Sequence, residues 1–173
     1  VLPGEKLEKK SESLWIINSK DRSNYVELLK SIKSSFNIAG ILLLWPKHWD
    51  ERHVDVNFGE EILACATHCV NALTKLNLSI PLWFLVGITD VIKSEAFSLP
   101  FPGLLSGFAR SLYLEHPGLK GGVVEYDAQA SKYVFEEIAY SAQEDHIRLL
   151  GDNRYLARLE RTNLDKSQTP AID

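Results

Sequence analysis

Residues 104–126 read LLSGFARSLYLEHPGLKGGVVEY and pass from one kind of secondary structure to another. Apolar residues recur at intervals of three and four through 104–114, which predicts an amphipathic helix. Pro117 and Gly118 end this helix, because proline cannot continue a helix and glycine favours turns. The apolar run 122–126 then predicts a buried strand. A helix followed closely by a buried strand is the repeating unit of α/β folds.

The same alternation extends toward the N-terminus. Short apolar runs at residues 14–17, 38–45 and 82–86 predict buried strands. The run 38–45 has no polar alternation, so we expect a central strand that is buried on both faces. Helical spacing fills the intervals, in 25–36 and over about 17 residues from Phe58. This part of the chain therefore adds strand and helix pairs of the same kind.

The C-terminal part completes the predicted fold. A further helix is expected at 133–142. Two strand-like runs, 146–150 and 155–159, are separated by Gly151-Asp152-Asn153, a sequence that predicts an antiparallel hairpin. The sequence as a whole predicts an α/β fold. We expect a truncated Rossmann-like parallel sheet with helices on both faces and a C-terminal antiparallel hairpin.

Composition limits the domain organisation and the partners. The 173 residues are 45% hydrophobic and carry a formal net charge of -4, which favours one domain with a sizeable core and disfavours nucleic acid as a partner. No apolar run approaches the roughly 20 residues of a membrane span, and no signal core precedes residue 14. We expect a cytoplasmic protein that has reduced cysteines and does not bind membranes. Residues 1–13 are interpreted as a polar lead-in, 14–162 as the domain and 163–173 as a linker or tail.

Several motifs occur in an order that is typical of one family. Residues 107–117, followed by 121–125, contain the pattern G-x-x-R, then E-H-P, then G-G. This pattern resembles the structural, non-catalytic subdomain of modular polyketide synthase ketoreductases. Residues 25–29 with the strand 39–45 are similar to the family's D-Y-x-x-L-L helix and its strand ending in L-W. Residues 155–159 are similar to its closing Y-V-A-R-L strand. The resemblance covers nearly the whole chain.

The resemblance implies a function. A structural, pseudo-Rossmann subdomain would dock onto a catalytic ketoreductase subdomain and hold it in shape. That companion would bind NADPH and reduce the β-keto group of a polyketide carried by an acyl carrier protein. Neighbouring synthase domains would be further partners. The residues of the motifs to which a structural or docking role is carried over are Gly107, Arg110, Glu115, His116, Pro117, Gly122 and Arg158.

The chain departs from the family pattern at a few places. Glu125 stands where the family has an aspartate at the end of the G-G strand. In the first strand of the hairpin, Arg148 and Leu150 stand near positions where alanine and arginine are usual. The family's structural half also has an additional βα unit ahead of the region that starts at Leu14, so the chain is expected to be shortened at this end.

The patterns of a complete reductase are missing from the sequence. No G-x-G-x-x-G motif is present, so no loop allows the close backbone approach that a dinucleotide pyrophosphate requires. None of the six tyrosines is followed four residues later by lysine or asparagine, the spacing found around the proton-donating tyrosine of this superfamily. We therefore expect that this chain binds no cofactor and has no catalytic or metal-ligating residues, and is not an enzyme on its own.

A second class of function stays open, a small stand-alone α/β enzyme. Cys65, His68 and Cys69 would share one face of a helix, and thiolate and imidazole are zinc ligands, but no fourth ligand is evident and buried packing is favoured.

Arg110, Glu115 and His116 form a second polar group, which could act as an anion clamp, an acid and a base. Their place at a helix end favours a capping or bracing role. A third possibility is an inactive ketoreductase remnant that serves as a scaffold between other domains.

Overall fold

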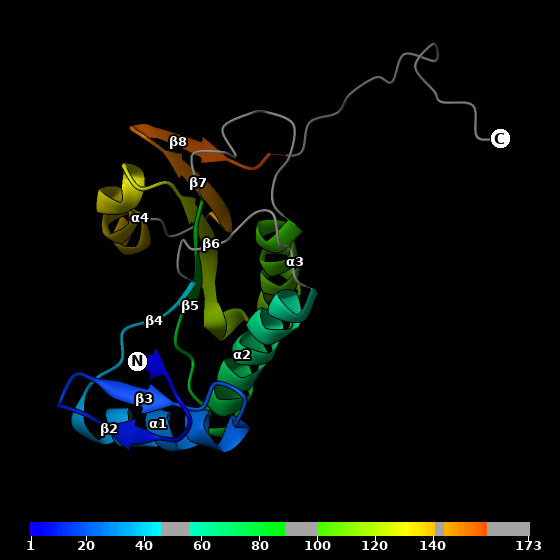
Figure 1. Cartoon of the computed structure of the whole chain (residues 1–173). Coiled ribbons are helices and arrows are strands. Elements are labelled where there is room, and N and C mark those ends of the chain that lie inside the picture. The colour runs from blue at the N-terminus through cyan, green and yellow to red at the C-terminus, as the bar shows by residue number, and fades with distance from the viewer. Residues whose placement is uncertain (46–55, 89–99, 141–143, 159–173) are drawn as a thin grey trace, which may run out of the picture.

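The computed structural model describes residues 1–45, 56–88, 100–140 and 144–158 (Figure 1). The elements in chain order are β1 (Leu2–Pro3), β2 (Glu8–Lys9), β3 (Trp15–Ile17), α1 (Arg22–Ser35), β4 (Ile41–Trp45), α2 (Val56–Lys75), β5 (Leu82–Gly87), α3 (Pro100–Glu115), the 3-10 turn η2 (Pro117–Leu119), β6 (Lys120–Tyr126), the 3-10 turn η3 (Ala130–Tyr133), α4 (Val134–Tyr140), β7 (His146–Leu150) and β8 (Asn153–Leu156).

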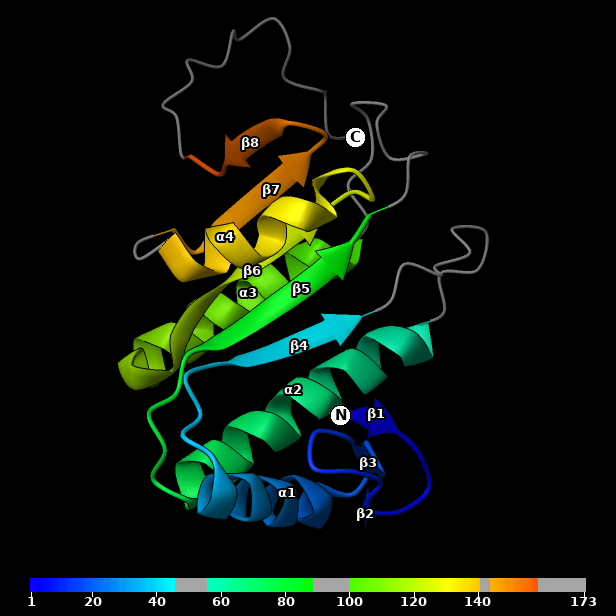
Figure 2. The ribbon, with the colours of Figure 1, turned by 90° about the vertical axis from the view of Figure 1, so that its left-hand side faces the viewer.

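The main sheet has five strands in the order β4-β5-β6-β7-β8. The first four are parallel, and β8 pairs antiparallel with β7. Figure 1 shows α2 and α3 on one side of the sheet and α4 on the other, and Figure 2 shows α4 in front of β6. This arrangement confirms the predicted α/β fold with helices on both faces and a C-terminal antiparallel pair. No helix in the described ranges is both long and apolar enough to span a bilayer.

Two hydrophobic cores lie on the two faces of the sheet. On one face, side chains of β5 and β6 such as Phe84 and Val123 pack against α2 and α3, and α1 packs on α2. On the other face, Trp83 and Leu85 join Ile147 in a smaller core under α4. Because successive side chains of a strand point to opposite faces, β5 supplies both cores.

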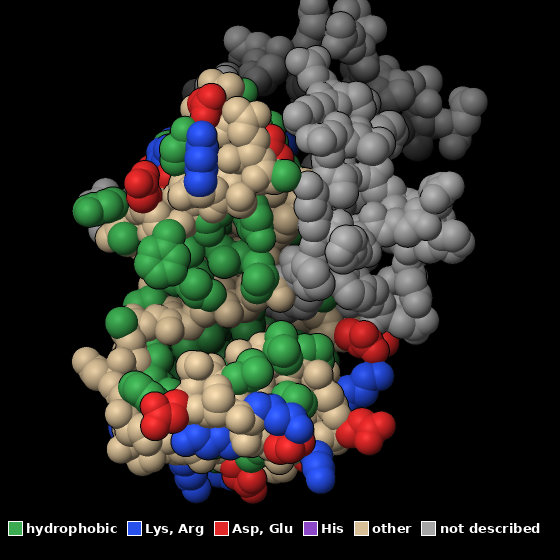
Figure 3. All heavy atoms as spheres, turned by 60° about the vertical axis from the view of Figure 1, so that its left-hand side comes forward, with side chains coloured by type: hydrophobic (Ala, Val, Ile, Leu, Met, Phe, Trp, Pro, Cys, Tyr) green, Lys and Arg blue, Asp and Glu red, His purple; other side chains and the backbone are tan. Residues whose placement is uncertain are grey.

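The expectation that residues 38–45 form a central strand is wrong. Among the residues that the structure describes, β4 lies at the edge of the sheet and pairs with β5 alone. Leu42 and Leu44 are 41% and 59% exposed, whereas Ile41 and Leu43 are partly buried. Figure 3 shows apolar side chains gathered on this side, where no helix covers β4 and β5. An unbroken apolar run identifies the strand, but it does not reveal how many neighbours the strand has.

The strand predicted at 14–17 forms as β3, but outside the main sheet. It pairs parallel with β1 and antiparallel with β2 in a small sheet of its own. Both partners come from the polar lead-in 1–13, whose composition gave no sign of strands. Ile17 is buried in the same core as side chains of α1 and α2, so this small sheet extends the larger core.

The other element boundaries differ from the predictions by a few residues. α3 begins at Pro100 instead of Leu104, and β8 ends at Leu156, with Asn153 in the strand. Gly151 has a φ of 57°, a conformation that glycine adopts without strain, and it allows the tight turn of the hairpin. The predicted tail 163–173 lies outside the described residues.

Candidate functional site

Gly121 and Gly122, the second and third residues of β6, let neighbouring atoms of β5 come close to their backbone. A Cβ atom at Gly122 would come within 2.7 Å of the Trp83 ring, and one at Gly121 would come within 2.3 Å of the Leu82 carbonyl oxygen. The register between β5 and β6 shifts between Leu82 and Trp83. Gly122, for which a structural or docking role is expected, is therefore needed for packing inside this chain.

The helix α3 has one buried side and one exposed side. On the buried side, Tyr113 donates a hydrogen bond of 2.9 Å to the carbonyl oxygen of Leu82, and Phe108 packs edge-on against Phe84 with ring centroids 5.9 Å apart. On the exposed side, a Cβ atom at Gly107 would meet no atom of the described residues within 4 Å. Leu114 is 84% exposed on this helix. The two motif glycines thus have opposite surroundings, since Gly122 is enclosed and Gly107 is open.

The exposed side of α3 combines small and apolar residues. Gly103, Gly107 and Ser111 are four residues apart and exposed, so they form a shallow row along the helix. Leu104 and Leu114 are exposed on the same helix. Small residues allow another backbone to approach closely, and exposed leucines provide apolar area to bury. This surface, which we call the α3 outer face, is the strongest candidate for a docking site.

Arg110, Glu115 and His116 are not brought together by the structure. Arg110 Nε donates to Asp145 Oδ2 at 3.3 Å, which links α3 to the start of β7. Glu115 is exposed, and the backbone of His116 serves the helix end: its N–H donates to Leu112 O at 2.7 Å. Pro117 then starts η2. This geometry agrees with bracing and helix termination, and it does not assemble an acid, a base and an anion clamp.

Arg158 closes the other end of the hairpin. Its guanidinium donates two hydrogen bonds, of 2.8 and 2.7 Å, to the carboxylate of Glu144. These contacts hold the pKa of Glu144 below its usual value. The pair fixes the segment after β8 to Glu144, which lies two residues before β7.

Cys65, His68 and Cys69 do share one side of α2, as the spacing predicted, but they serve packing. Burial raises the pKa of the Cys69 thiol to about 12, which disfavours the thiolate that zinc requires. The His68 ring packs against Tyr25 with centroids 5.6 Å apart, and Cys65 Sγ lies 4.0 Å from Ser19 O. Within the described residues, no three side chains of metal-ligating type converge.

A buried polar cluster under α3 was not anticipated from the sequence. The carboxylate of Glu125, 1% exposed, accepts from His146 Nε2 at 2.5 Å and from Arg148 Nε at 2.8 Å. The other ring nitrogen, His146 Nδ1, lies 3.2 Å from Ser106 Oγ. A carboxylate only accepts, so Nε2 carries the hydrogen, and Nδ1 of a neutral ring accepts from Ser106.

This cluster occupies positions where the chain departs from its family pattern. Glu125 and Arg148 are the replacements noted above, and they are register partners on β6 and β7. Both residues differ from the family pattern, and one is acidic and the other basic. This combination is the sequence signal that could have revealed the ion pair between Glu125 and Arg148. Ser106 is only 6% exposed, and Arg148 neutralises the carboxylate, so the group is suited to a structural role and not to attack on a substrate.

The fold and these residues together define a class of protein before any comparison. A mostly parallel sheet flanked by helices, closed by a hairpin and lacking a glycine-rich phosphate loop in its sequence, is a truncated Rossmann-like domain.

Comparison with known proteins agrees with this class. No family model matches the chain. The polyketide synthase GfsA of Streptomyces halstedii is 28% identical over 151 residues, which are 83% of this chain and 2% of that protein. The chain thus spans a small part of its curated relative.

Solved structures give the same result for the fold. An A-type ketoreductase from a modular polyketide synthase has a TM-score of 0.62 at 21% identity, and the match covers 90% of this chain and 35% of that one. A C2-type ketoreductase gives 0.63 at 20% identity, over 87% and 34%. A structure described as an adenylation, ketoreductase and pseudo Asub multidomain NRPS module gives 0.72 at 15%, over 89% and 14%. The predicted resemblance is confirmed: the chain has the fold of the structural subdomain of a modular polyketide synthase ketoreductase.

Replacing each motif glycine by alanine should have opposite effects on stability. Gly122→Ala would push a methyl group into the Trp83 ring and should lower the free energy of unfolding by about 1–3 kcal/mol. Gly107→Ala adds a methyl group in open space on a helix and should raise it by about 0.5–1 kcal/mol. Urea unfolding followed by circular dichroism measures both. Equal effects would contradict the packing role assigned to Gly122.

Removing the carboxylate of the buried cluster should be costly. Glu125→Leu leaves His146 and Arg148 without their acceptor and should lower the free energy of unfolding by about 2–3 kcal/mol. Glu60→Leu, at an exposed glutamate of α2, is the control and should change it by less than about 0.5 kcal/mol. Urea denaturation of the two variants and of the parent chain measures these free energies of unfolding. If Glu125→Leu costs as little as Glu60→Leu, the cluster contributes little to stability.

Proposed function

We propose that this chain is the structural subdomain of a polyketide synthase ketoreductase and that it holds a catalytic companion subdomain in its active shape. The observation that carries the proposal is the match of 87–90% of this chain to about a third of each of two modular ketoreductases. In this reading, the companion binds NADPH and reduces the β-keto group of a polyketide bound to an acyl carrier protein. Neighbouring synthase domains would surround the pair.

The residues of this chain do not fit NADPH. In doubly wound sheets, phosphates bind at the carboxyl ends of the strands, against backbone N–H groups. At the end of β6 this chain instead places Asp127, a buried carboxylate that accepts from Ala130 N at 2.8 Å and from Gly151 N at 2.9 Å. The N–H groups of Ala130 and Gly151 are already occupied by this carboxylate, so they are not available to a pyrophosphate. Binding of the cofactor by the companion subdomain alone is consistent with this.

The buried tyrosines are poor candidates for proton donors. Burial raises the pKa of Tyr25 and of Tyr113 above the ordinary value of a phenol. A general acid works best when its pKa lies near the working pH, so the shift is in the wrong direction. The hydroxyl group of Tyr113 also already donates its hydrogen bond to Leu82 O. These groups support a scaffold and not a reductase within this chain.

The α3 outer face is the surface that we assign to the companion. It is exposed although it carries Leu104 and Leu114, and the row of small residues leaves room for a close approach. Burial of such apolar area drives association between domains. Gly107 then has a role that this chain alone does not explain, since its open side would be filled by the partner.

The isolated chain should not bind NADPH. Titration followed by the fluorescence of the reduced nicotinamide should give no saturable signal, whereas the complete ketoreductase domain should give one under the same conditions. The reason is the missing phosphate loop and the carboxylate of Asp127 at the strand end. Micromolar binding by the isolated chain would show that it holds the cofactor itself, and would overturn the proposal.

Substitutions on the α3 outer face should impair the complete domain without unfolding this chain. Leu114→Glu and Gly107→Trp should each lower the rate of NADPH oxidation by the complete ketoreductase by about tenfold, the effect of losing about 1.4 kcal/mol of docking energy.

The matched control is Phe135→Glu, which changes another exposed apolar residue, 76% exposed on α4. It should leave the rate unchanged. Circular dichroism of the isolated chain should show that all three variants stay folded. If Leu114→Glu and Gly107→Trp act no differently from the control, docking does not use this face.

A further inference from the structure

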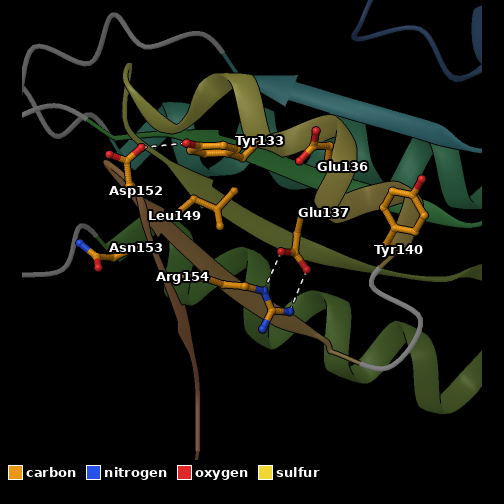
Figure 4. A pocket seen from close by; sticks show the side chains of 8 residues that line it. All are labelled: Tyr133, Glu136, Glu137, Tyr140, Leu149, Asp152, Asn153 and Arg154. Carbon is orange, nitrogen blue, oxygen red and sulfur yellow. Dashed lines mark hydrogen bonds and ion pairs between the residues drawn. The ribbon is translucent and has the colours of Figure 1, made fainter.

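A pocket lies on the other side of the sheet, between α4 and the hairpin β7-β8. Its volume is about 440 Å³, within the range of ligand sites in proteins. Leu149 lies between the two walls, where Tyr133 and Tyr140 stand at opposite ends (Figure 4). The full lining is Tyr133, Glu136, Glu137, Tyr140, Leu149, Asp152, Asn153 and Arg154.

Acidic groups outnumber basic ones in this lining. Glu137 is held by Arg154, whose guanidinium donates two hydrogen bonds of 2.6 and 2.8 Å. Asp152 accepts from the Tyr133 hydroxyl at 2.8 Å. Glu136 is exposed and has no ion pair within the described residues. The pocket therefore has one carboxylate available to a cation that comes from outside.

The rim of the pocket already binds a cation of the chain itself. Lys132 Nζ lies 4.6 Å from the centroid of the Tyr133 ring and 3.5 Å from Asp152 Oδ1. These contacts raise the pKa of Lys132, chiefly through Tyr133 and further through Asp152. A ring face together with a carboxylate is the arrangement that attracts ammonium and guanidinium groups. Tyr140 and Glu136 supply a second ring and carboxylate to the lining of the pocket, four residues apart on α4.

We propose that this pocket binds the side chain of an arginine presented by an extended segment of a partner protein. A guanidinium can stack on a tyrosine ring and pair with a carboxylate in a two-pronged contact, as Arg154 already does with Glu137. Tyr140 is 85% exposed and extends beyond the pocket, where it can contact the residues that flank the arginine. This site is separate from the α3 outer face, because the sheet lies between them.

The inference is independent of the proposed docking to a catalytic subdomain. It depends only on the charges and rings of α4, η3 and the hairpin. The pocket could hold its arginine whether or not the α3 outer face has its companion. The two proposals therefore fail separately.

The test uses a small peptide as the probe. The peptide acetyl-Gly-Arg-Gly-amide is titrated into the full chain, and binding is followed by shifts of backbone amide signals in two-dimensional NMR. Saturable shifts at Glu136, Tyr140 and Asn153 are expected. The same peptide with citrulline in place of arginine has the same shape without the charge. It should bind at least about fourfold more weakly, the scale of an exposed ion pair.

Two variants test whether the arginine peptide binds in this pocket. Glu136→Gln should weaken the arginine peptide about fourfold, because it removes the unpaired carboxylate and keeps the side-chain size. Glu60→Gln, at an exposed glutamate on α2, should leave the affinity unchanged. Both are surface changes that keep the fold. Equal binding of the arginine and citrulline peptides, or equal affinity in the two variants, would overturn the proposal.

Discussion

The burial of β5 on both faces is the constraint on which the rest of the structure depends. Every residue from Leu82 to Gly87 is buried, so packed side chains must lie against both faces of β5 and strands must pair with both of its edges. Phe84 and Val86 define the core under α2 and α3, and Trp83 and Leu85 define the smaller one. The glycines of β6 follow from the same constraint, since the Trp83 ring can be buried only if its neighbour lacks a Cβ atom.

Sequence periodicity predicted the elements that contact β5. It did not predict which strands pair with each other, because that depends on parts of the chain that are distant in sequence. The helix and strand in residues 104–126 formed as expected, because local spacing reports which face of an element is buried. The edge position of β4 and the separate sheet of β3 could not be predicted, because an apolar run is the same whether one or two strands flank it. Leu2–Pro3 and Glu8–Lys9 pair with β3 through backbone groups, which amino-acid composition does not reveal.

For the candidate sites, motifs identified residues but not their surroundings. Gly107 and Gly122 are the same residue type in the same recognised block, yet one faces open space and the other an indole ring. The Glu125 cluster depends on a register between strands about twenty residues apart, which one sequence does not reveal. The pocket below α4 was missed for a similar reason. Its residues come from a helix and a hairpin whose charges look solvated until the two are placed side by side.

The uncovered edge of β4 also has a consequence for how the chain associates with other molecules. Its outer row of N–H and C=O groups has no partner strand among the described residues, and Leu42 and Leu44 line the adjoining face. A flat apolar edge of this kind pairs with whichever extended segment reaches it first. The same edge therefore offers another copy of the chain a template for pairing, which makes it a site of aggregation.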